Sequence, residues 1–201
     1  MGSKERILRL KHETRTRILD AALNIAQVEG WQGLSMRKIA DQIEYTAASI
    51  YEYFSSKEAI LQELSRRGFL MLTKDIRDAR DRCEEARDKM EAMWIAYWNF
   101  AFAYPEFYRL MYGVDMVSCA ENSAINEAEN LFAMFGDVIE SLFEKKPVSE
   151  DSVCMKYYTY WSIIHGLISI NLARLNGRTT TEINQQILKD AIKGITLSVN
   201  S

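Results

Sequence analysis

Apolar side chains recur every three or four residues along most of this chain, which is the spacing of an α-helix rather than of a strand. The first such stripe contains Ile18, Ala22, Ile25 and Ala26 and predicts a helix over about residues 10–29, which Gly30 is suited to end. Eight further helices are predicted, over about residues 35–42, 46–53, 57–82, 84–103, 105–112, 122–144, 149–177 and 179–199. No segment alternates like a strand, so the expected fold is all-α with about nine helices.

The segment from Leu34 to Leu61 differs from the rest, because it divides into short helices that each begin near a hydroxyl residue. Ser35 and Thr46 stand at helix-capping positions, and Ser55 with Glu58 has the spacing of a capping box. Two short helices joined by a tight turn form a helix-turn-helix, whose second helix enters the major groove of DNA. A plain helical subdomain whose tyrosines cover a core is the alternative.

The same segment resembles the DNA-binding lobe of TetR-type transcriptional regulators over about residues 12–61. The matching stretches are Arg17–Ala22, Gly30, Ser35–Ala40, Ser49–Phe54 and Lys57–Ala59. The resemblance implies a helix-turn-helix lobe over residues 1–56 and a C-terminal helical lobe for ligand binding and dimerisation over residues 57–201. It also implies a homodimer on palindromic double-stranded operator DNA, usually a repressor, that a small-molecule effector releases.

The resemblance also suggests a role for each residue of the DNA-binding surface. Phosphate contacts would come from Ser35, Arg37, Tyr53 and Lys57, and contacts at or near base edges from Thr46, Ala47, Ser49 and Tyr51, with Ala48 beside them. The chain departs from the family where Ala47 and Ala48 replace a common Lys or Pro followed by Gly, and at Glu52. The turn at residues 43–45 also lacks the usual glycine, and these departures leave the operator sequence open.

Aromatic residues gather in the middle of the chain and predict either a tightly packed core or a cavity for a lipophilic or aromatic effector. The stretch Trp161–Gly166 looks like the Trp-His-Gly signature of one subtype of these regulators, although a lone histidine such as His165 is often a hydrogen-bonded core residue. The candidate ligand-binding residues are Trp94, Tyr97, Trp98, Phe102, Tyr108, Met111, Phe132, Phe135, Trp161 and His165.

The last two predicted helices carry apolar residues on more than one side, so both sides must be buried. A monomer of this size cannot cover both sides, which predicts a two-fold symmetric four-helix interface with a second copy. The candidate interface residues are Ile164, Ile168, Leu172, Ile187, Ala191 and Ile195.

Composition and charge narrow the function further. The chain has 201 residues, 48% of them hydrophobic, and a net charge of −3. Its first residues are nevertheless basic, with Lys4, Arg6, Arg9, Lys11, Arg15 and Arg17 opposed only by Glu5 and Glu13. Such a head suits contact with phosphate, or is simply a solvated, frayed arm.

Several classes of protein are excluded on the sequence. Two histidines and three widely spaced cysteines suggest no metal site, and an odd number of cysteines favours a reduced, cytoplasmic location. No apolar run is long enough for a membrane span. No nucleophile–base pair, glycine-rich phosphate loop or cofactor motif supports the rival hypothesis of an enzyme or ligand carrier. A second rival is a dimeric DNA-binding adaptor with a filled core and no inducer.

Overall fold

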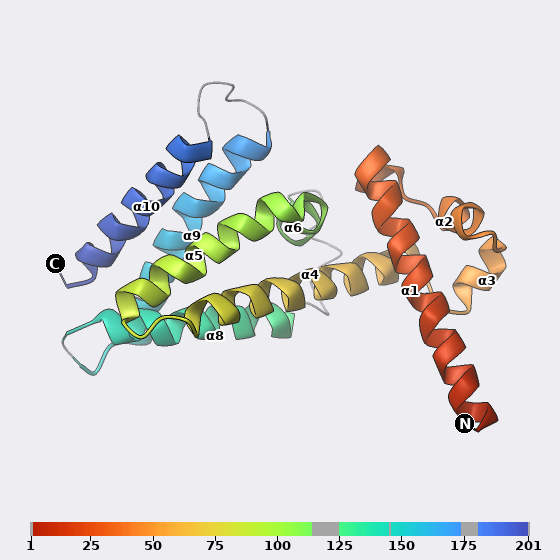
Figure 1. The fold of residues 1–201 in the computed structure, drawn as a ribbon, viewed down its shortest axis with the longest axis horizontal. Coiled ribbons are helices and arrows are strands. Elements are labelled where there is room, and N and C mark those ends of the chain that lie inside the picture. Colours follow the sequence, from red (N-terminus) through yellow and green to blue (C-terminus); the bar gives the residue numbers. More distant parts are fainter. Residues whose placement is uncertain (1, 114–124, 145, 174–180, 201) are drawn as a thin grey trace. The chain divides into compact units, whose positions relative to one another are not determined.

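The computed structural model describes residues 2–113, 125–144, 146–173 and 181–200 (Figure 1). Within these ranges there are helices and no strands, which confirms the predicted all-α class. The helices are α1 (Ser3–Glu29), α2 (Met36–Ile43), α3 (Ala47–Tyr51), α4 (Lys57–Arg80), α5 (Ala86–Ala103), α6 (Pro105–Tyr112), α8 (Ile125–Leu142), α9 (Glu150–Leu172) and α10 (Thr181–Leu197), with 3₁₀ turns at Trp31–Gly33 and Ser198–Asn200.

Three helix ends differ from the prediction in ways that matter for the site. α1 begins at Ser3 rather than near residue 10, because its first turns consist of good helix formers and Glu5 accepts a hydrogen bond from the Gly2 N–H at 3.1 Å. α3 ends at Tyr51 rather than near residue 53. Ser56 rather than Ser55 caps α4, since its Oγ accepts from the Ala59 N–H at 3.3 Å. The predicted helix ends near residues 122, 177 and 179 lie outside the described residues.

The contacts divide the chain into two compact units. The N-terminal unit comprises Met1–Gly68 and Glu106–Ala124, and the C-terminal unit comprises Phe69–Pro105 and Ile125–Ser201. The chain therefore passes from one unit to the other inside α4 and again at the start of α6. Residues 57–68 belong to the N-terminal unit although they lie beyond the predicted lobe boundary at residue 56, and the functional boundary stays a prediction.

The N-terminal unit is built around α1. Ile18 of α1, Ile39 of α2 and Ile50 of α3 are fully buried, with α1 packed against α2 and α2 packed against α3. Figure 1 shows the first turns of α1 continuing past α2 and α3. The side chains of these first turns are exposed.

α6 joins the same unit through a close approach to α4. A Cβ atom at Gly68 would lie only 2.5 Å from the Met111 sulfur and 3.1 Å from a Phe107 ring carbon. The indole N–H of Trp31 donates to the Glu106 carbonyl at 3.0 Å and fixes the start of α6 from the other side. A larger residue at position 68 would therefore displace the Met111 side chain and press on the Phe107 ring.

The C-terminal unit packs α5 against α8, α9 and α10, and α9 contacts both α8 and α10. Large side chains fill its interior, including Trp94, Phe100, Phe135 and Tyr160, none of which is more than 2% exposed. No helix within the described ranges is long and apolar enough to cross a bilayer.

Candidate functional site

The outward face of α3 carries short and hydroxylated side chains. Ile50 and the following Phe54 point into the core, whereas Ala48 is exposed and Tyr51 is 54% exposed. Thr46 caps the helix, because its Oγ1 accepts from the Ser49 N–H at 3.1 Å. This cap places the Thr46 and Ser49 hydroxyls 2.8 Å apart at the start of the helix, where donors are needed for phosphates or base edges.

Two arginines of α1 hold the ends of the helix-turn-helix. Arg15 donates to the Tyr53 carbonyl at 2.7 Å, and its guanidinium lies 4.1 Å from the centre of the Phe54 ring. Arg17 donates to the Ile43 carbonyl at 3.1 Å and lies over the Tyr45 ring. The planar guanidinium can make a hydrogen bond and an aromatic contact together, which lysine does less well. In the sequence both arginines belong to the basic head, and nothing in the pattern indicates this positioning role.

The predicted phosphate-binding residues lie at the start of α2, just after α3 and at the start of α4. Ser35 caps α2 by accepting from the Lys38 N–H at 3.2 Å, so its hydroxyl is held at a helix start. Arg37 is exposed and has only a loose ion pair with Asp41, at 3.9 Å. Lys57, at the start of α4, and Tyr53, just after α3, are both half-buried. Lys38, by contrast, pairs with Glu29.

The turn between α2 and α3 contains a left-handed residue that is not glycine. Glu44 has a φ of 62° and a ψ of 41°, a conformation that costs an ordinary residue about 1–2 kcal/mol. Its N–H and that of Tyr45 bond to carbonyls near the end of α2, and Arg17 occupies the Ile43 carbonyl. These bonds hold the turn without the glycine expected from the family.

Most of the predicted ligand-binding residues of the C-terminal unit belong to one network of ring contacts, which Tyr157 and Tyr158 connect. Trp94 stacks on Phe135 with ring centres 4.1 Å apart and meets the Tyr97 ring edge-on at 5.5 Å. Trp98 neighbours Phe102, and Trp161 stacks on His165 at 4.5 Å. Phe132 meets Tyr157 at 4.7 Å, and the Tyr157 ring lies 6.1 Å from Trp94.

Tyr108 and Met111 do not belong to the aromatic cluster. Both are buried in the N-terminal unit, where Met111 lies against Gly68. Neighbouring positions in the sequence suggested a single group, but the fold separates them at the start of α6.

The rings of Tyr157 and Tyr160 of α9 complete the aromatic cluster around Trp94. Neither tyrosine is among the ligand-binding residues predicted from the sequence. The Tyr160 ring lies 5.8 Å from Trp94, and its hydroxyl is 2.7 Å from that of Thr196. Burial raises the pKa of Tyr160 to about 12, with the Thr196 hydrogen bond opposing the shift, and burial also raises the pKa of Tyr157. The helical spacing of these tyrosines with Ile164 was the available signal.

The indole nitrogen of Trp94 is a buried donor with no hydrogen-bond partner among the described residues. Leaving such a donor unsatisfied costs about 1–3 kcal/mol. The rings around it otherwise pack closely, so Trp94 belongs to a mostly filled core.

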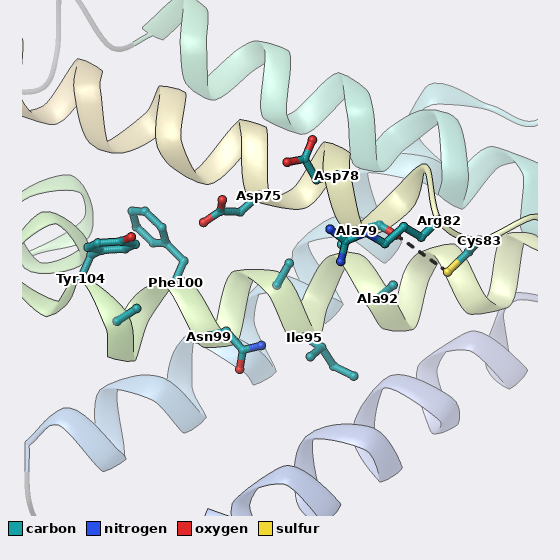
Figure 2. A pocket seen from close by; sticks show the side chains of 12 residues that line it. Asp75, Asp78, Ala79, Arg82, Cys83, Ala92, Ile95, Asn99, Phe100 and Tyr104 are labelled. Atoms are coloured by element: carbon teal, nitrogen blue, oxygen red, sulfur yellow. Dashed lines mark hydrogen bonds between the residues drawn. The ribbon is translucent and has the colours of Figure 1, made fainter.

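A groove lies elsewhere in the C-terminal unit, between α4 and α5, and has a volume of about 630 Å³. Figure 2 shows Asp75 and Asp78 entering from α4, and Asn99, Phe100 and Tyr104 from the α5 side. Alanines make up much of the remaining lining. Of the ten predicted ligand-binding residues, none lines this groove. The described residues contain no cluster of side chains arranged for a metal ion.

The predicted dimer residues divide between two sides of α9 and α10. Ile164, Ile168 and Ile195 are buried inside the protomer, Leu172 and Ala191 are half-buried, and Ile187 is 43% exposed. The outer sides of the two helices instead present Ile163, Ile170, Ile183 and Leu197, which sequence analysis did not choose. An apolar stripe on each side of a helix does not reveal which side faces the core.

Two family models together match most of the chain. Residues 18–64 match the model described as bacterial regulatory proteins of the tetR family, and residues 90–191 match the tetracyclin repressor-like C-terminal domain. The second match alone spans about half of the chain.

Curated relatives match over shorter stretches. The chain is 29% identical over 93 residues to the HTH-type transcriptional repressor KstR of Rhodococcus jostii (strain RHA1), which covers 46% of this chain and 42% of that protein. It is 37% identical over 59 residues to KstR of Mycobacterium tuberculosis, covering 29% and 27%. The chain thus spans less than half the length of these relatives. The family and these relatives are transcriptional regulators rather than enzymes.

Solved structures share the fold along nearly the whole chain. A protein of unknown function from Rhodococcus sp. RHA1 aligns with a TM-score of 0.76 at 20% identity, covering 93% of this chain and 95% of that one. A TetR-family transcriptional regulator from Bordetella parapertussis 12822 aligns with a TM-score of 0.69 at 14% identity, covering 90% and 93%. At these identities the likeness shows the fold alone.

The burial of His165 leads to a pH-dependent stability. Burial lowers the pKa of His165, because the imidazolium would lose hydration. The unfolded chain then takes up a proton more readily than the folded chain, so the contribution of His165 to stability is complete above the ordinary pKa of 6.5 and is lost as the pH falls below it. We expect the free energy of unfolding, measured in urea, to fall between about pH 7.5 and about pH 5.5, and to fall less in His165→Gln.

The other histidine supplies the control. His12 is exposed on α1, so His12→Gln should retain the pH dependence of the parent protein. Carboxyl groups with a lowered pKa, such as Glu58 and Glu63, titrate below this range. A pH dependence in His165→Gln equal to that of the parent would contradict the assignment.

Proposed function

Because the chain belongs to the TetR family of bacterial regulatory proteins, we propose that it is a cytoplasmic repressor that binds palindromic operator DNA as a homodimer and is released by a small lipophilic or aromatic effector. The observation that carries the DNA-binding part is the exposed face of α3, held at the helix-turn-helix ends by Arg15 and Arg17. A preorganised helix of small and hydroxylated side chains can enter the major groove without losing entropy in ordering itself. The Trp-His-Gly subtype around Trp161 and His165 also remains a proposal.

The proposed contacts divide by type. Ser35, Arg37, Tyr53 and Lys57 bind phosphates and set the position of the protein on the duplex. Thr46, Ala47, Ala48, Ser49 and Tyr51 lie at the base edges. The exposed carboxylate of Glu52 would be repelled by phosphate, and it can instead accept from the amino group of a cytosine.

Substitutions at Tyr51 and Lys57 test the DNA-binding part. Lys57→Ala should weaken binding to all duplexes and reduce the dependence of log affinity on log salt by roughly one unit per protomer. Tyr51→Ala should weaken binding to an operator selected from a random pool more than binding to random duplex. Fluorescence anisotropy titrations at several salt concentrations measure both effects.

Lys146→Ala, at an exposed position of the C-terminal unit away from the proposed dimer helices, is a matched control that should leave the salt dependence and the discrimination between duplexes unchanged. Parental salt dependence in Lys57→Ala together with parental discrimination in Tyr51→Ala would remove these residues from the interface.

The homodimer rests on the outer sides of α9 and α10. Ile163 and Ile170 are each 44% exposed and flank Gly166 at helical spacing on α9. On α10, Ile187 lies two turns before Gly194 and Leu197 one turn after it, on the same side of the helix. A Cβ atom at either glycine would meet nothing within 4 Å inside the protomer. Two apolar stripes with a glycine in each allow a second copy to approach closely and form a four-helix interface.

Charged substitutions on these stripes should dissociate the dimer without unfolding the protomer. Ile163→Glu with Ile187→Glu buries two carboxylates in the proposed interface and leaves the protomer core intact. We expect a monomer by analytical ultracentrifugation and a loss of operator affinity of at least tenfold. Val28→Glu changes an equally apolar but 85% exposed residue of α1 and should remain dimeric. A monomeric parent protein, or a dimeric double variant, would refute the interface.

The effector part of the proposal rests on the groove between α4 and α5. Its volume of about 630 Å³ suits a small molecule, and Phe100 and Tyr104 offer aromatic surface beside alanines. A ligand there contacts Asp75 and Ala79 of α4, the helix that continues into the N-terminal unit. A coupling of only about 1–3 kcal/mol between the groove and the DNA-binding surface is enough for regulation.

The packed rings around Trp94 favour the rival function, an adaptor without an inducer, so the two need a direct test. Ala96→Phe fills the groove, and we expect it to retain DNA binding and to lose the thermal stabilisation that lipophilic or aromatic compounds give the parent protein. Ala133→Phe, on the exposed side of α8, is the control and should retain that stabilisation. If no compound from such a library, and none identified by mass spectrometry in the purified protein, alters operator affinity, the adaptor is correct.

A further inference from the structure

The first turns of α1 form a helical arm, residues 3–13, that the other described helices leave exposed to solvent. Every described side chain of this arm is exposed, including Ile7 at 61% and Leu8 at 67%. A free helix of this length would be marginal in water, but this one continues directly into the packed half of α1. The arm is therefore a helical extension of the DNA-binding unit.

The face of the arm is fixed by the half of α1 that follows it. Ile7, Leu10, Thr14 and Ile18 follow helical spacing, and the last two are buried against the helix-turn-helix. The exposed part of this stripe therefore lies on the same side of α1 as α2 and α3. A hollow of about 350 Å³ lined by Ile7, Leu10, Lys11, Glu52 and Tyr53 shows directly that the arm lies beside the end of α3.

Two rows of cations flank the apolar stripe. Lys4 and Lys11 share one side of the helix with Arg15, which reaches the Tyr53 carbonyl after α3. Arg6 shares the other side with Arg17, which reaches the Ile43 carbonyl before α3. Each row therefore begins on the arm and ends at an arginine that is hydrogen-bonded to the backbone of the helix-turn-helix.

Glu52 gives Lys11 an additional electrostatic role. Its carboxylate is exposed at the end of α3 and would repel nearby phosphates. Lys11 lines the same hollow and offsets this charge, so a duplex can approach the end of α3. Charge complementarity and continuity with the α3 surface both favour DNA as the partner of the arm.

We propose that residues 3–13 form a second DNA-contacting element, in which Lys4, Arg6 and Lys11 neutralise backbone phosphates flanking the segment that α3 occupies. This inference rests on the proposed DNA-binding function and adds to it an interaction surface outside the helix-turn-helix. The contacts are to phosphate, so the arm increases affinity for every duplex without selecting a sequence.

The test compares two charge-matched triple variants. Lys4→Gln/Arg6→Gln/Lys11→Gln removes the cations of the arm, and glutamine preserves its helix. Lys74→Gln/Arg87→Gln/Lys146→Gln removes the same charge from exposed positions of the C-terminal unit. Affinities for a random-sequence duplex of about 30 base pairs, long enough for two half-sites, and for a duplex selected by the parent protein are measured between about 50 and 200 mM salt.

The arm variant should reduce the dependence of log affinity on log salt by about 2 units or more for the dimer, so the affinity lost over this salt range shrinks by roughly tenfold or more. Both duplexes should be weakened by the same factor, and the control variant should behave like the parent protein.

Other outcomes overturn the inference in distinguishable ways. If the parent protein binds DNA and the arm variant has the salt dependence of the control, the arm is not an interface while the proposed function stands. Loss of discrimination between the two duplexes would make the arm a base-reading element, which also contradicts the proposal. Sedimentation with anionic phosphatidylglycerol vesicles that depends on the arm, together with unchanged DNA binding, would assign it to a lipid surface. A parent protein that binds neither duplex would refute the function and the arm together.

Discussion

Two hydrogen bonds from arginines to backbone carbonyls keep the helix-turn-helix in place. Arg15 reaches the Tyr53 carbonyl and Arg17 reaches the Ile43 carbonyl, so the short α3 is held before its start and after its end. A five-residue helix cannot maintain its own geometry in water. The face that α3 presents therefore depends on α1, and the same helix carries both a packed half and the exposed arm.

The chain passes between its two units inside α4 and at the start of α6. Gly68 and Trp31 hold α6 in the N-terminal unit, although α6 directly follows α5 of the C-terminal unit. The aromatic residues that seemed to form one group in the sequence are therefore separated into two environments. Tyr108 and Met111 report on the packing of α6, whereas Trp94 and its neighbours report on the core of the C-terminal unit.

The sequence predicted those features whose cause is local. Ser35, Thr46 and Ser149 cap helices as expected, because a capping bond joins residues only three apart. The roles of Arg15 and Arg17 could not be predicted, since their partners lie 38 and 26 residues away. Helical periodicity identified α9 as apolar on several sides, but it could not distinguish the buried Ile164 and Ile168 from the exposed Ile163 and Ile170. The groove between α4 and α5 was also missed, because small residues such as Ala79, Ala92 and Ala96 give no periodic signal of an open space.

The continuity of α4 has a mechanical consequence. Its 24 residues form one helix about 36 Å long, and bending it between the units would break backbone hydrogen bonds. A small rotation about one end is therefore transmitted with a long radius: a swing of about 5° carries the far end by about 3 Å. A molecule in the groove that tilted α4 by this amount at Asp75 and Ala79 would displace Lys57, at the opposite end, by more than the tolerance of a hydrogen bond.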